Sequence, residues 1–87
     1  MSNYGLVYYS VIGNGAKETL RGYAQALKSL RELGLINVKV FPFGEEHILD
    51  LLRNGFMLYG QREDVLSLIE HVNKTGPSRV LAVPVVS

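Results

Sequence analysis

Two segments at opposite ends of the chain are apolar on both of the faces that a β-strand presents. Residues 5–12 and residues 79–86 are rich in valine, leucine, isoleucine and tyrosine, and neither has a polar residue at every second position. Because side chains alternate between the two faces of a sheet, Tyr8 and Tyr9 fall on opposite sides, and both sides are apolar. A sheet built from these segments therefore needs cover on both of its faces.

The chain between these segments supplies two long helices and one short helix. We expect strands at residues 5–12, 37–43, 56–59 and 79–86, long helices at residues 16–33 and 61–72, and a short helix at residues 45–53. Apolar spacings of three and four in the first long helix predict a buried stripe made of Ala16, Leu20, Tyr23, Ala24, Leu27 and Leu30. Gly22 lies inside this helix, where it favours close packing on the sheet. Gly34 is in the usual position for the residue after a helix end.

This order of elements predicts a single domain, residues 1–87, of the α+β class. We expect a ferredoxin-like βαββαβ sandwich, in which a four-stranded antiparallel sheet carries the two main helices on one face and the short extra helix is inserted between the second and third strands. An all-parallel sheet is the alternative, because residues 44–55 just reach the length of a parallel crossover. Pro42 and Pro84 cannot donate to a ladder, which favours edge positions for the second and fourth strands in both arrangements.

Composition excludes several classes of protein. The chain contains no cysteine, which removes disulfides, thiolate zinc sites and cysteine nucleophiles and is compatible with the cytoplasmic location that we expect. Its net charge is +1, so overall charge does not attract it to nucleic acid or anionic lipid. The longest apolar run, residues 80–86, is far shorter than the roughly 20 residues of a membrane span.

Two long helices can cover only one face of the predicted sheet. The other face is then an apolar patch larger than a monomer normally exposes, and we expect a second copy to cover it in a homodimer or higher homo-oligomer. The interface residues that we predict are Tyr8, Tyr9, Val83 and Val85. The alternative is a monomer in which the short helix at residues 45–53 folds over part of this face.

The run Gly13-Asn14-Gly15-Ala16-Lys17 joins a strand to a helix N-terminus. Glycines allow backbone N–H groups to approach a ligand, and the helix dipole favours an anion, so this loop is a candidate site for a phosphorylated or heterocyclic metabolite. The spacing matches no known phosphate-binding fingerprint. The alternative is a simple turn in which Asn14 caps the helix.

Short runs spread over most of the chain form a series in a fixed order: Ser10-Val11-Ile12, Tyr23-Ala24, Leu33-Gly34-Leu35, Pro42-Phe43-Gly44, Glu63-Asp64-Val65 and Gly76-Pro77-Ser78-Arg79-Val80. This series resembles the small thiamine-binding ferredoxin-like family. The resemblance implies a ferredoxin-like architecture, assembly of such units through their sheets into dimers or tetramers, and a small ligand held by the assembly.

No catalytic signature is present, because the serines lack a nucleophile context and neither His47 nor His71 has an evident partner nucleophile. We therefore expect a small oligomeric ligand-binding or regulatory module without a metal or cofactor, with the candidate ligand-binding residues Gly13, Asn14, Gly15, Lys17, Tyr8 and Tyr59. The alternative is a structural or protein-interaction subunit that uses residues 45–53 and the open sheet face. A single-stranded RNA-binding domain is a third hypothesis, but basic residues are not interleaved with the sheet aromatics.

Overall fold

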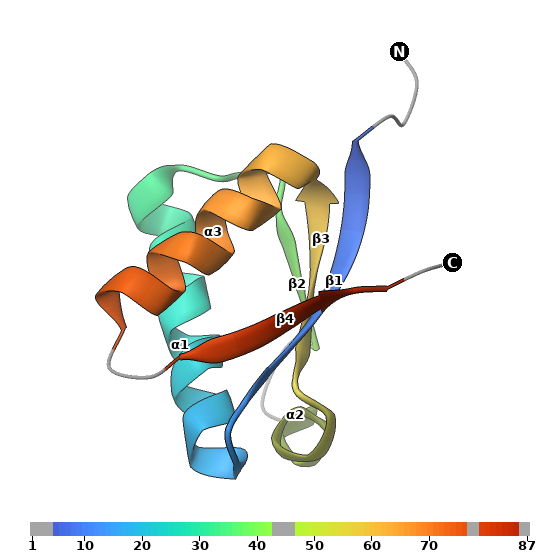
Figure 1. The fold of residues 1–87 in the computed structure, drawn as a ribbon, viewed down its shortest axis with the longest axis vertical. Helices are drawn as coiled ribbons and strands as arrows, with labels where there is room; N and C mark the ends of the chain where they lie inside the picture. Colours follow the sequence, from blue (N-terminus) through green and yellow to red (C-terminus); the bar gives the residue numbers. More distant parts are fainter. Residues whose placement is uncertain (1–4, 43–46, 77–78, 86–87) are drawn as a thin grey trace.

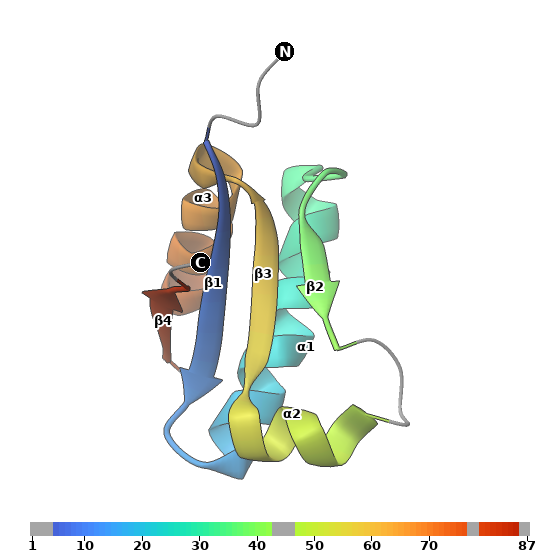
Figure 2. The same cartoon turned by 90° about the vertical axis from the view of Figure 1, so that its right-hand side faces the viewer.

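A four-stranded sheet with helices on one face forms the body of the molecule (Figure 1). The computed structural model describes residues 5–42, 47–76 and 79–85. The elements in chain order are β1 (Leu6–Gly13), α1 (Ala16–Leu33), β2 (Lys39–Phe41), α2 (Ile48–Asn54), β3 (Phe56–Gln61), α3 (Arg62–Thr75) and β4 (Val80–Pro84). Helices α1 and α3 lie side by side behind the sheet, and α2 lies across the end of the sheet where β3 begins (Figure 2).

The strands follow the spatial order β2-β3-β1-β4, and every neighbouring pair is antiparallel. The α+β class and the antiparallel sheet are thus confirmed, and the all-parallel alternative is wrong. The outer strands are β2 and β4. These are the two strands for which Pro42 and Pro84 predicted edge positions. The arrangement is compatible with a ferredoxin-like fold.

Helix α1 begins and ends at the predicted residues, but only part of the predicted stripe is buried, since Tyr23 and Leu30 pack against the core. Its fully buried positions carry small residues, namely Thr19, Gly22, Ala26 and Ser29, whereas Leu20 and Leu27 of the predicted stripe are 41% and 38% exposed. A Cβ atom on Gly22 would overlap Cγ1 of Val80 in β4. The helix therefore lies so close to the sheet that small residues fill the contact and leucines flank it.

The core lies between the sheet and the two long helices. Val11, Phe56, Leu58, Leu68 and Val72 are almost completely buried there. Tyr9 belongs to this same cluster and is only 9% exposed. It therefore faces the helices, on the side of the sheet opposite to Tyr8, and the expected role of Tyr9 in an interface over the open face does not agree with its position.

Several element boundaries differ from those that the sequence predicted. Strand β3 continues to Gln61 because it pairs with β1 along that whole length. Helix α3 continues to Thr75, since the sequence offers no glycine or proline stop before residue 76. Helix α2 begins at Ile48, and the predicted helical positions 45 and 46 lie outside the described residues.

Candidate functional site

Helices α1 and α3 leave one face of the sheet open (Figure 2). Apolar side chains of β1 and β4 are exposed on this face. We call these side chains the apolar strip; it consists of Tyr8 and Ile12 of β1 and of Leu81, Val83 and Val85 on and just after β4. Their exposed fractions range from 37% for Ile12 to 65% for Leu81. The sequence predicted three of these five residues, Tyr8, Val83 and Val85, as interface residues.

Tyr8 is held in place by a cross-strand partner on the same face. It is directly opposite Tyr59 of β3 in the register, and the two ring centroids are 4.3 Å apart. The hydrogen bond from the Arg62 N–H to the Gly5 carbonyl, at 2.6 Å, makes the Tyr8–Tyr59 pair one of the non-hydrogen-bonded pairs, in which side chains approach most closely. The two tyrosines predicted to bind a ligand are therefore together on the open face.

The free edge of β4 is closed to further strand pairing. The Val85 N–H donates to a β1 carbonyl at 2.9 Å, so alternate residues Val80, Ala82 and Pro84 direct their backbone groups outward. The side chain of Asn73 accepts from the Val80 N–H at 2.7 Å and donates to the Val80 carbonyl at 3.3 Å. Pro84 has no N–H to offer. Only Ala82 retains both backbone groups for another strand, so this edge is a poor site for association.

A cleft of about 600 Å³ lies beside the apolar strip, between the open face and α2. We call it the α2 cleft. It is lined by Ser10, Phe41, Pro42, Asp50, Asn54, Gly55 and Met57. Its apolar walls come from the sheet, and its carboxylate and amide come from α2. The sequence analysis did not identify this cleft.

Helix α2 is fixed in position by its buried side and by the turn that follows it. Leu51 is 3% exposed and anchors the helix to the core. The Gly55 N–H donates to the Leu51 carbonyl at 2.9 Å, and Gly55 has a φ of 79°. A Cβ atom there would overlap the Val11 carbonyl oxygen, so only glycine allows the chain to pass this close to β1. Asp50 and Asn54, four residues apart, consequently share the helix face that lines the cleft.

The glycine loop before α1 is closed by its own hydrogen bonds. The Gly13 N–H donates to Oγ1 of Thr19 at 3.0 Å, and the Thr19 hydroxyl donates to the Gly15 carbonyl at 2.8 Å. The Gly15 N–H donates to the Gly13 carbonyl at 3.0 Å. Two of the N–H groups that an anion would need are therefore already bonded. The residue that caps α1 is Gly15, without a side-chain hydrogen bond, so the expectation of an Asn14 cap is wrong.

The predicted ligand-binding residues form two separate groups. Gly13 follows Tyr8 by five residues of an extended strand, which is about 16 Å along the chain. Beside Gly13 and Asn14, a hollow of about 380 Å³ is lined by Arg79, whereas Lys17 does not line it. The cation that lines this hollow thus comes from Arg79, the residue before β4, and only the folded register reveals it.

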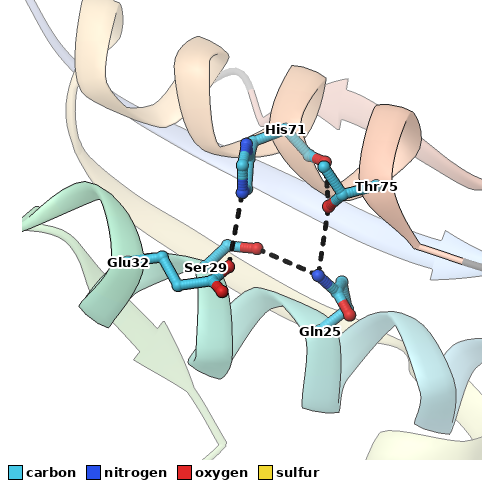
Figure 3. A network of polar contacts seen from close by, with 5 residues as sticks. All are labelled: Gln25, Ser29, Glu32, His71 and Thr75. Atoms are coloured by element: carbon cyan, nitrogen blue, oxygen red, sulfur yellow. Dashed lines mark hydrogen bonds and ion pairs between the residues drawn. The ribbon is translucent and has the colours of Figure 1, made fainter.

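A second polar cluster joins the outer sides of α1 and α3 (Figure 3). Gln25 donates to the Thr75 hydroxyl at 3.1 Å and to the buried Ser29 hydroxyl at 3.4 Å. Nε2 of His71 is 3.4 Å from a carboxylate oxygen of Glu32, and both side chains reach solvent. These contacts join one helix to the other.

Among the described residues, no group of three or more histidine, aspartate and glutamate side chains could hold a metal ion. None of the helices within residues 5–42, 47–76 and 79–85 has both the length and the apolar character needed to cross a membrane. No model of a protein family matches the chain, and no curated protein or solved structure matches it.

Proposed function

We propose that this chain is a small homo-oligomeric binding module of ferredoxin-like topology, with α2 as an insertion between β2 and β3. The antiparallel order β2-β3-β1-β4, with α1 and α3 behind the sheet, supports this topology. The observation that carries the function is the apolar strip, because no described element covers it. In this proposal a second copy covers the strip in the cytoplasm, and the module binds a small molecule beside it.

The size of the open face supports a second copy as its cover. The four strands have eight, three, six and five residues, so at about 3.3 Å per residue and about 4.8 Å between strands they span a footprint of about 350 Å². Protruding side chains raise the accessible area above that footprint, which suits an interface smaller than the roughly 800 Å² per partner of a standard complex. Because the β4 edge is largely closed by Asn73 and Pro84, strand pairing at that edge is disfavoured, which favours packing of face against face over association through β4.

Sedimentation equilibrium over a range of micromolar concentrations tests this proposal with a matched pair of variants. Leu81, in the strip, and Leu49, on α2, are 65% and 69% exposed. We expect the parent chain to sediment as a dimer or larger species, Leu81→Glu as a monomer, and Leu49→Glu like the parent. A parent chain that is monomeric at every concentration would overturn the proposal.

The second candidate function, a protein-interaction subunit that uses α2, is favoured by the exposure of Leu49 and Ile48 on that helix. The same experiment separates it from the first. If Leu49→Glu dissociates the assembly and Leu81→Glu does not, α2 is the interaction surface and the strip is not.

A further inference from the structure

The α2 cleft brings together three polar side chains that have no partner of their own. Across residues 5–42, 47–76 and 79–85, the Ser10 hydroxyl, the Asp50 carboxylate and the Asn54 amide make no hydrogen bond or ion pair with another group. They come from β1 and from two successive turns of α2. They converge on one cleft only because Gly55 lets the chain pass directly over β1.

The walls of the cleft give it a mixed character. Phe41, Pro42 and Met57 supply apolar and aromatic surface, and among the described residues of the lining Asp50 is the one ionisable group. Small-molecule sites commonly have about 300–1,000 Å³ of space, mostly apolar walls and a few polar groups that fix the orientation of the ligand. At about 600 Å³ the α2 cleft lies within this range.

The lining also defines the charge of the ligand. An anion would meet the Asp50 carboxylate, and the part of the lining that the structure describes holds no lysine or arginine to offset it. An ammonium group would donate charge-assisted hydrogen bonds to that carboxylate, and the face of an aromatic ring such as Phe41 also attracts a cation. The remaining apolar wall would take an apolar body attached to the ammonium.

We propose that the α2 cleft binds a small organic amine in its protonated form, with the ammonium on Asp50 and an apolar body against Phe41 and Met57. This inference names the ligand class of the binding module and rests on the proposed function to that extent. It does not depend on the second copy, because every lining residue belongs to one chain.

The test titrates 2-phenylethylammonium and its uncharged analogue 2-phenylethanol into the ¹⁵N-labelled full chain and follows the amide chemical shifts. We expect the ammonium to shift the signals of Ser10, Asn54 and Met57 in a saturable way and to bind about tenfold more tightly than the alcohol, as one charge-assisted bond implies. Asp50→Asn should remove this preference. Glu70→Gln, which changes the net charge equally on an exposed part of α3, should retain it.

Equal affinity for the two probes, an unchanged preference in Asp50→Asn, or shifts confined to other parts of the chain would each overturn the proposal. Repeating the titration with Leu81→Glu separates this failure from failure of the oligomer. A monomeric Leu81→Glu that still prefers the ammonium supports the cleft, and its loss of the preference would overturn the assignment to a site within one chain.

Discussion

Gly22 offers the most direct test of how closely α1 packs on the sheet. Replacing glycine by alanine inside a helix normally stabilises the helix by about 1 kcal/mol. Here the added methyl group would overlap Cγ1 of Val80, and overpacking of a well-packed core costs about 1–3 kcal/mol. We therefore expect Gly22→Ala to lower the free energy of unfolding by about 0–2 kcal/mol, the sum of these opposed effects.

Val80 cannot easily move away from the new methyl group. It is a β-branched residue with a stiff χ1 angle, it is 8% exposed, and Asn73 bonds both its N–H and its carbonyl. Val80→Ala removes the contacted methyl and should cost about 2 kcal/mol by itself. In that background Gly22→Ala should become stabilising by about 1 kcal/mol, because only the helix preference remains.

Urea denaturation followed by far-UV circular dichroism, at one fixed protein concentration, measures all members of this cycle. Ala24→Gly, at an exposed position of the same helix, is the control and should cost about 1 kcal/mol from helix preference alone. If Gly22→Ala stabilises the parent chain by as much as Ala24→Gly destabilises it, the close contact with Val80 does not exist and the reasoning is refuted.

Two further substitutions test single polar side chains. Asn73→Ala should lower the free energy of unfolding by about 1–2 kcal/mol, because the two hydrogen bonds to Val80 are lost; dynamic light scattering should also detect larger assemblies, since the β4 edge is then open. An unchanged particle size would show that Asn73 does not prevent association through the β4 edge. Thr19→Val, nearly equal in volume and fully buried, should cost about 1–3 kcal/mol in thermal denaturation because the Gly13 N–H loses its acceptor. A melting temperature equal to that of the parent would contradict the closed glycine loop.

Local patterns in the sequence were sufficient to predict the element order and the sheet edges. Runs of β-branched and aromatic residues, apolar spacings of three and four, the glycine after α1 and the two prolines each act over a few residues. Their structural effect can therefore be predicted without knowledge of the fold. Gly34 does have the left-handed φ of 68° expected at a helix end. Both proline-marked strands are outer strands.

The buried face of α1 was predicted only in part, because apolar spacing did not identify the small residues at its centre. Leu20 and Leu27 have the spacing of a core stripe, yet the helix approaches the sheet through Gly22 and Ala26. A helix that lies this close to a sheet needs small side chains at the contact. A search for apolar residues at helical spacing does not detect small side chains, because it ignores side-chain volume. Gly22 was the single residue whose identity indicated the contact.

The candidate sites required knowledge of long-range pairing. Ser10 and Asp50 are far apart in the sequence, and only the β1–β3 register and the turn at Gly55 place both in one cleft. The glycine loop shows the converse: its residue types fit an anion site, but the hydroxyl of Thr19 already bonds its backbone. Residue types indicate which chemistry is available, whereas the folded contacts decide which groups remain unpaired.

Ser10 connects the two proposed binding surfaces. It lies between Tyr8 and Ile12 on the same face of β1 and also lines the α2 cleft, so a second copy seated on the apolar strip would reach the border of the cleft. If that copy alters the affinity of the cleft for an ammonium ligand, linkage requires the ligand to alter the association of the copies by the same factor per site. Comparing the affinities of the parent chain and Leu81→Glu for 2-phenylethylammonium therefore measures how far the amine can regulate assembly. Equal affinities would mean that the two surfaces act independently although they share one strand.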